Sequence, residues 1–212
     1  MRFWPILAAL VLAGVVAASA HADARAVSAR DRALLARSAT AEEQIAERVA
    51  ERLTGHKVVA VRCGDIGESA NVLGVTPLLD NRSFDYFLMR PAECTYLAWF
   101  RQAPRRWDPA SCAEADCARI GPIAMALAVV AHESYHVIGY SNEAQVECYG
   151  MQSIWFVANR LGAPVAEAQA LAAFYATRMY PRRRTQSPRY WSPECRDGGK
   201  LDLRPQLHGW PS

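Results

Sequence analysis

The sequence has little or none of several features that mark common functional classes. Only two of its 24 basic residues are lysines, and the formal net charge is +3. A charge this small gives no argument for nucleic acid or another polyanion as a partner. Beyond its first 20 residues the chain has no apolar run long enough to cross a bilayer, and it has no internal repeat and no C-x-x-C pair. The last absence argues against a structural zinc ribbon.

The first 20 residues have the composition of a targeting segment. They contain a basic residue at Arg2, an uncharged apolar run from Phe3 to Ala20, and an Ala-x-Ala site that ends at Ala20. This order predicts a signal peptide cleaved after Ala20, or else after Ala24. The protein is then secreted or held in the cell envelope, with no membrane association after cleavage. The run is also close to the lower length limit of a span, so an uncleaved anchor stays open.

Six cysteines in an exported chain predict up to three disulfides, whose pairing the spacing alone leaves open. Closeness in sequence and the need to pin a polar tail favour the pairs Cys63–Cys94, Cys112–Cys117 and Cys148–Cys195. That tail, from Arg182 onward, mixes arginines with Tyr190 and Trp191. It is interpreted as a solvated face, with an acidic cell-surface polymer as the alternative partner.

With 212 residues and 51% hydrophobic composition, the chain is long enough for one core. The predicted organisation is a signal peptide (1–20), a flexible lead or frayed helix (21–37) and a single domain (38–212). Periodicity and capping signals favour an α+β fold, mainly α, with a small antiparallel sheet and C-terminal helices. Helices are predicted at 40–55, 92–100, 122–138, 143–161 and 163–180, strands at 57–63 and 85–90, and an irregular stretch at 102–120.

The strongest chemical signal is His132, Glu133 and His136, which spell H-E-x-x-H. On a helix the two histidines lie one turn apart on one face, so both imidazoles can bind one ion with Glu133 beside it. The preceding apolar run from Pro122 to Ala131 predicts a buried helix that begins at Pro122. Core histidines without a ligand are the alternative, which is disfavoured because buried charge beside them is costly without a partner.

A catalytic zinc ion needs a third protein ligand. Glu143 lies seven residues past His136, which on an unbroken helix is roughly 10 Å along the axis and too far to share an ion. The chain must therefore turn back. Gly139 suits a left-handed helix end, and Ser141 or Asn142 can cap a second helix that begins near Glu143. Such a turn predicts Glu143 as the third metal ligand.

Glu147, one turn beyond Glu143, suits a supporting role in which it accepts a hydrogen bond from a ligating imidazole. Two other ligand sets stay open. Glu147 is itself a carboxylate and an alternative ligand. The metzincin pattern H-E-x-x-H-x-x-G-x-x-H is matched at Gly139, but Asn142 stands where its third histidine would be. Asn is a poor zinc ligand beside Glu143, so the favoured set is His132, His136 and Glu143.

The run from His132 to His136, followed by Glu143 to Cys148, resembles the gluzincin family of HExxH zinc metallopeptidases. In that family the second helix carries Glu-x-x-Ala-Asp, and its first Glu binds the zinc. The Glu-x-x-x-Glu-Cys ending is similar to neutral zinc metallopeptidases of bacteria and to uncharacterised secreted bacterial proteins with closely spaced motifs. A weaker likeness covers Cys195 to Pro205. Two features depart from the family: Glu147 replaces the usual Asp, and the two motifs lie closer together.

The resemblance implies a zincin-like active-site helix and a secreted metallopeptidase that hydrolyses peptide bonds in a peptide or protein substrate. Zn²⁺ is then held by His132, His136 and Glu143, and Glu133 acts as general base. An edge strand over the active-site helix can pair with an extended substrate. The unranked candidates for an oxyanion donor are Tyr140, Tyr149, Tyr175 and His208. A secreted zinc-binding module without turnover and a membrane-anchored interaction protein are the alternative functions; the oligomeric state stays unknown.

Overall fold

The computed structural model describes residues 27–56, 58, 60–67, 72–80, 82–207 and 210–211. The predicted signal peptide and its cleavage sites lie outside the described residues. The chain divides into a short unit up to Ser38 and a main unit from Ala39 to Ser212. The short unit contains helix α2, Ala29–Ala36, where a flexible lead or frayed helix is predicted. Ser28 caps this helix by accepting a hydrogen bond from the Asp31 amide.

The main unit contains a small mixed sheet. Its strands are β1 (Ala60–Cys63), β5 (Tyr86–Met89) and β2 (Gly74–Val75), in the order β1-β5-β2. β1 runs parallel to β5, whereas β2 runs antiparallel to it, so the expected antiparallel sheet is only partly antiparallel. A separate antiparallel hairpin joins β3 (Leu78–Leu79) and β4 (Arg82–Ser83). The central strand β5 is buried along its whole length, as expected of a strand with neighbours on both edges.

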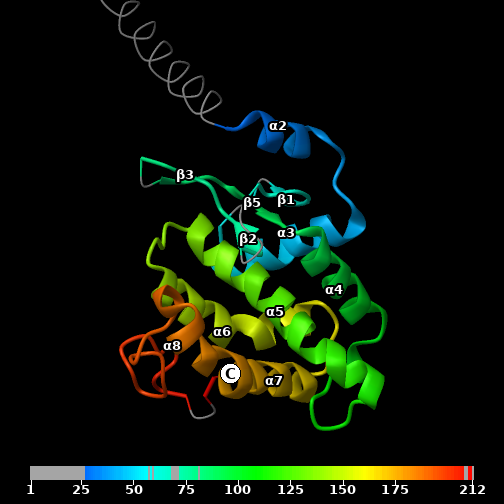
Figure 1. Cartoon of the computed structure of the whole chain (residues 1–212), viewed down its shortest axis with the longest axis vertical. Coiled ribbons are helices and arrows are strands. Elements are labelled where there is room, and N and C mark those ends of the chain that lie inside the picture. The colour runs from blue at the N-terminus through cyan, green and yellow to red at the C-terminus, as the bar shows by residue number, and fades with distance from the viewer. Residues whose placement is uncertain are drawn as a thin grey trace, which may run out of the picture. The chain divides into compact units, whose positions relative to one another are not determined.

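Helix α5, Glu114–Val137, runs through the centre of the main unit. The sheet lies on one side of it, and α6 with α7 lies on the other (Figure 1). The helix starts well before Pro122, where the sequence predicts its first turn. An interior proline removes one helical hydrogen bond and costs roughly 3 kcal/mol or more. Burial of Ile120 and Ile123 on either side of it offsets this cost, because both side chains belong to the core.

Within the described part of the chain, α5 is also the one helix long and apolar enough to cross a membrane. No membrane span is expected at this position, because the apolar run that the sequence predicts as helical begins only at Pro122. In the structure, 56% of the most apolar window of α5 is buried inside the protein. Helices α3, α4 and α6 and strands β2 and β5 all pack against it. The apolar character of α5 is therefore that of a core helix.

The helices before α5 follow the sequence signals closely. α3 spans Ala41–Thr54 and begins with the predicted capping box between Thr40 and Glu43. It ends at Gly55, whose φ of +68° is left-handed. α4 spans Pro91–Gln102 and starts on a proline, as a first helical turn allows. A 3₁₀ turn, η1 (Pro104–Arg106), follows in the stretch predicted to be irregular.

The helices after α5 depart from the prediction at one point. α6 spans Glu143–Arg160 and α7 spans Val165–Phe174, close to the expected ranges. The third helix is expected to stop before Pro181, but a π-helical turn, η2 (Tyr175–Met179), leads into α8 (Tyr180–Gln186) and then the 3₁₀ turn η3 (Pro188–Tyr190). Pro181 is tolerated because it lies in the first turn of α8. The α+β, mainly α, fold class is confirmed.

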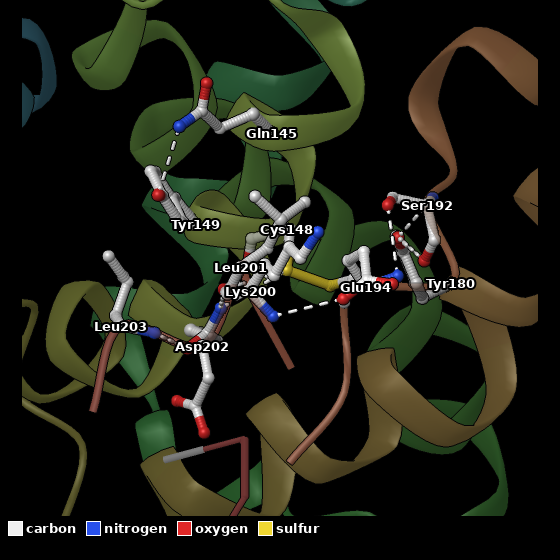
Figure 2. The surroundings of a disulfide bond; sticks show 12 residues. Gln145, Cys148, Tyr149, Tyr180, Ser192, Glu194, Lys200, Leu201, Asp202 and Leu203 are labelled. Atoms are coloured by element: carbon white, nitrogen blue, oxygen red, sulfur yellow. Dashed lines mark hydrogen bonds between the residues drawn. A yellow bond between two sulfur atoms is a disulfide. The ribbon is translucent and has the colours of Figure 1, made fainter. Parts of the chain in front are cut away.

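All three predicted disulfides are present: Cys63–Cys94, Cys112–Cys117 and Cys148–Cys195. The third joins α6 to the C-terminal tail, and Glu194 and Leu201 lie beside it (Figure 2). Gln152 holds the same tail, because its amide donates to the Leu201 carbonyl (2.7 Å) and accepts from the Leu203 amide (2.8 Å). Three disulfides indicate an oxidising compartment.

Candidate metal centre

The last two turns of α5 carry His132 and His136, and Glu143 is the first residue of α6. Between the helices Gly139 has a left-handed backbone with φ of +94°, which few side chains tolerate. The Asn142 side chain then caps α6 by accepting from the Gln145 amide at 3.0 Å. The predicted turn at Gly139 and Asn142 is therefore confirmed, and α6 packs back against α5 (Figure 1).

Three side-chain atoms converge where the two helices meet. The Nε2 atom of His132 lies 3.1 Å from Nε2 of His136 and 3.2 Å from Oε2 of Glu143. The distance from His136 Nε2 to the same Glu143 oxygen is 3.5 Å. A tetrahedral zinc ion with bonds of about 2.0–2.1 Å keeps its ligand atoms roughly 3.3 Å apart. The three atoms therefore have the spacing of a shared ion, and this group can hold a metal ion.

The outer nitrogens of the two imidazoles define their tautomers. His136 Nδ1 lies 2.7 Å from the Tyr140 carbonyl oxygen, which can only accept, so Nδ1 carries the hydrogen. His132 Nδ1 lies 3.1 Å from Oε2 of Glu147, a carboxylate that also accepts two other hydrogen bonds. In the neutral rings, both Nε2 atoms then carry lone pairs. Two lone pairs and a carboxylate oxygen thus face one point, an arrangement that favours a cation there.

Glu147 is held from three directions and is 5% exposed. Besides His132, its carboxylate accepts from the Tyr175 hydroxyl at 2.6 Å and from Arg183 Nε at 3.0 Å. The buried charge is thus paired and hydrogen-bonded, which a buried carboxylate requires. Glu147 thus makes the hydrogen bond to His132 that its predicted supporting role requires. The hydrogen bonds from Tyr175 and Arg183 to the same carboxylate are not predicted from the sequence.

The π-helical turn explains how two residues of one helical segment reach the same carboxylate. Tyr175 and Arg183 are eight positions apart, which in a regular α-helix leaves them about 80° apart around the axis. One π turn accommodates an extra residue and reduces this offset to about 20°. The amide of Tyr180 bonds to the Tyr175 carbonyl, as a π turn requires. No signal in the sequence marks this turn, apart from the Pro181 that follows it.

The carboxylates change the proton affinity of the cluster. Burial disfavours a charged His132, but hydrogen bonds to Glu143 and Glu147 outweigh it and raise the pKa of His132 to about 10. Burial would likewise raise the pKa of Glu143, but hydrogen bonds to His132 and His136 hold it well below its usual range. In the metal-free protein, a proton on His132 therefore takes the place of a cation. Metal binding must displace that proton.

The two alternative ligand sets have other roles in the structure. Asn142, at the position of a third metzincin histidine, uses its side-chain oxygen as the cap of α6. Glu147 faces Nδ1 of His132, whereas the proposed ligand atom of that ring is Nε2. The three converging residues are thus the favoured set, His132, His136 and Glu143.

Glu133 points toward the sheet side of α5, where it contacts Thr76, and it lines the same cleft as His132. The Thr76 hydroxyl lies 2.9 Å from Oε2 of Glu133 and 3.1 Å from its main-chain oxygen, so it can donate to either. A β-carbon on Gly74 would lie 2.8 Å from Oε1 of Glu133, so only glycine lets β2 approach this closely. Burial is the largest influence on the carboxyl and raises the pKa of Glu133. Its pKa is therefore moved toward the range useful for proton transfer near neutral pH.

A cleft of about 470 Å³ opens beside the cluster. Its lining includes His132, Glu133 and Glu147, the segment from Val72 to Gly74, and the segment from Ser187 to Tyr190. The segment from Ser187 to Tyr190 belongs to the tail that is expected to be a solvated face, because a run of arginines gives no hint of a long-range approach to α5.

Among the residues that line the cleft, Tyr190 best fits the role of an oxyanion donor. Its ring centroid lies 5.8 Å from that of His132, and Arg183 and Arg189 lie over its ring at 5.5 and 4.6 Å. Burial raises the pKa of Tyr190, so its hydroxyl stays protonated. Of the predicted donors, Tyr175 is occupied by Glu147, and Tyr140 and Tyr149 pack with Tyr135 in a cluster away from the cleft. His208 lies outside the described residues.

Comparison with known proteins gives no family assignment. No family model matches the sequence, and neither a curated protein nor a solved structure matches it. The function must therefore be argued from the site itself.

Proposed function

We propose that the protein is an exported zinc-dependent metallopeptidase of gluzincin type. The observation that carries the proposal is the convergence of His132 Nε2, His136 Nε2 and a Glu143 oxygen on one point, beside a cleft that His132 and Glu133 line. Among the described residues the group has three candidate ligands. Three protein ligands and an open side are typical of catalytic zinc, whereas structural zinc usually has four. Two imidazoles and a carboxylate also favour zinc over calcium or magnesium.

The residues around this point have the chemistry that peptide hydrolysis needs. When bound, zinc supplies Lewis acidity, which polarises a carbonyl and acidifies a water molecule. Glu133 accepts a proton from the attacking water and returns it to the leaving amine. Thr76 holds this carboxylate by its hydroxyl. Tyr190 keeps its phenolic proton and donates a hydrogen bond to the negative charge that develops on the carbonyl oxygen.

The edge strand β2 supports a peptide as the substrate. It is the outer strand of the three-stranded sheet, and Gly74 lines the cleft. Its other edge pairs with β5, with Gly74 opposite Met89 and Val75 opposite Leu88. A peptide in the cleft adds one more strand, so main-chain hydrogen bonds hold it with little dependence on its sequence.

Export is supported by two independent features. The first 20 residues have the order of a signal peptide, and three disulfides indicate an oxidising compartment. Gluzincin-type ligation rests on Glu143, which begins the second helix as the family pattern implies. The resemblance to secreted bacterial metallopeptidases thus agrees with the proposed compartment.

The test is metal content and casein cleavage by the purified mature protein, measured in parallel for wild type, Glu143→Ala and Glu133→Gln. We expect one zinc per chain in the wild type, loss of zinc in Glu143→Ala, and retained zinc without cleavage in Glu133→Gln. Asp197→Ala, at an exposed carboxylate that does not line the cleft, serves as control and should leave both readouts unchanged.

Other outcomes separate the competing functions. Zinc retained by a wild type that cleaves neither casein nor a broad peptide library would support a non-catalytic zinc-binding module. Cleavage that survives Glu133→Gln would remove the proposed base. A mature protein that holds no metal after incubation with zinc would contradict the proposal as a whole.

A further inference from the structure

A second pocket lies on the surface between α3, α4 and the end of α6, with a volume of about 300 Å³. It shares no lining residue with the cleft at the candidate metal centre. Four arginines line it: Arg48 and Arg52 from α3, Arg101 from α4 and Arg160 from α6. Its apolar lining includes the core residue Val49. Half of the residues around this pocket are therefore cationic.

Three of the four glutamates of α3 point away from the pocket. Ile45, Arg48, Val49 and Arg52 follow the spacing of one helix face, which lines the pocket. The glutamates at 43, 47 and 51 occupy another face and bind the segment that leads into and forms β1, accepting from the amides of Cys63, Val61 and Val58. The charge of α3 is thus divided between two sides, and the one glutamate on the pocket side, Glu42, pairs with Arg101.

The pocket arginines have little compensating charge. Arg101 pairs with Glu42 at 3.3 Å, and Arg160 lies over the Phe156 ring at 5.1 Å. In the part of the chain that the structure describes, Arg48, Arg52 and Arg160 form no ion pair. Like charges four residues apart on a helix, such as Arg48 and Arg52, repel each other. An anion between these side chains relieves that repulsion.

We propose that this pocket binds a multiply charged oxyanion of the phosphate-ester class. Guanidinium groups match such groups well, because each presents paired N–H donors to two oxygens at once. The pocket volume admits a phosphate or diphosphate group, and its apolar lining accepts the carbon skeleton of an ester. The site is independent of the proposed peptidase activity and gives the protein a second ligand.

The test is calorimetric titration of the full mature protein with pyrophosphate at low ionic strength. We expect saturable binding of one pyrophosphate per chain and at least tenfold weaker binding in Arg48→Gln/Arg52→Gln. Glutamine keeps helix propensity, and both positions are exposed, so thermal melting should show a folded variant. The matched control, Arg182→Gln/Arg196→Gln, removes two exposed arginines outside the pocket and should bind within twofold of wild type.

Two further arms separate the sources of the anion and the two sites. Because pyrophosphate also binds metal ions, the titration is repeated in Glu143→Ala, where the arginine pocket should still bind it. Co-sedimentation with phosphatidylglycerol vesicles that pyrophosphate displaces would assign a lipid headgroup, and binding of free pyrophosphate alone would assign a soluble ligand. Absence of saturable binding, or equal loss in both double variants, would overturn the proposal.

Discussion

The two faces of the last turns of α5 are supported by different parts of the molecule. On one face His132 and His136 meet α6, and their outer nitrogens bond to Glu147 and to the Tyr140 carbonyl. On the other face Glu133 meets the sheet side, where Thr76 donates to it. Helices thus orient the proposed metal ligands, whereas the segment around β2 orients the proposed base.

This separation has a functional consequence. A change on the helix side should alter metal affinity first, because the outer hydrogen bonds of the imidazoles fix their tautomers and directions. A change on the strand side should alter turnover while the metal content stays constant. Variants on the two sides therefore test whether the two supports are independent.

The largest effect is expected for Glu147→Ala. It removes the partner of His132 Nδ1 and leaves Arg183 half-buried without its carboxylate. Metal affinity should fall about 100-fold. The free energy of unfolding should fall by up to about 3 kcal/mol, since the exposed part of Arg183 is screened by water. Chelator competition and denaturant unfolding measure the two quantities. Equal metal affinity in Glu147→Ala and wild type would show that the helix-side network has no part in metal binding.

A change of pH should affect the helix side next most strongly. The pKa of His132 is about 10 in the metal-free protein, so a proton occupies this ring throughout the neutral range. Metal must displace it, and the proton is harder to displace as the pH falls. Apparent zinc affinity should thus rise about tenfold per pH unit between pH 6 and 8, measured with a buffered chelator. An affinity independent of pH would mean that His132 is already neutral before metal binds.

Thr76→Val tests the strand side. Valine has nearly the same shape but cannot donate to Glu133, so the pKa of this carboxyl should rise further and the acid limb of the pH–rate profile should move to higher pH. We expect kcat/KM at neutral pH to fall about tenfold, with zinc content unchanged. Thr95→Val, at an exposed threonine of α4, is the control. Loss of zinc in Thr76→Val would show that the two faces of α5 do not act independently.

The smallest effect is expected for Gly150→Ala on α6. The added β-carbon would lie 3.2 Å from the His132 amide nitrogen and 3.3 Å from its Cα, so one helix must shift slightly. Gly121→Ala on α5 is the matched control, because its β-carbon would meet nothing within 4 Å. In the control, the gain in helix propensity is opposed by contact between the new β-carbon and the ring of Pro122, so its stability and zinc affinity should stay close to those of wild type. Gly150→Ala should lose stability and a few-fold in zinc affinity, as thermal melting and chelator competition would show. Identical behaviour of both variants would mean that His132 tolerates the shift.

Local chemistry allowed much of the fold and the site to be predicted from the sequence. The capping box at Thr40, the left-handed Gly139 and the cap at Asn142 depend on neighbouring residues only, and all three are confirmed. The disulfide pairs are confirmed as well. The start of α5 is predicted too late, because the sequence rule places Pro122 in a first turn, whereas burial in the core outweighs the lost hydrogen bond.

Residues far apart in the chain were predictable only in part. Thr76 lies 57 positions before Glu133, whereas Tyr190 and Arg183 lie 58 and 51 positions after His132. No spacing rule links residues this far apart to the site. The parallel pairing of β1 with β5 could not be predicted either, because the apolar pattern of a strand is the same in either direction. The arginine pocket is another such case, since the net charge of +3 gives no sign of it.

The amino-acid sequence alone predicts the helix that carries His132 and His136 and the turn that returns Glu143 to them, and it favours the cysteine pairs without deciding them. Each follows from backbone preferences and side-chain chemistry over a few residues, or from pairing of the nearest cysteines. The carboxylates and hydroxyls that surround those groups become visible only in the folded protein. Their placement depends on how α8 and the segment around β2 pack against α5, and packing minimises the free energy of the whole core rather than of any one segment.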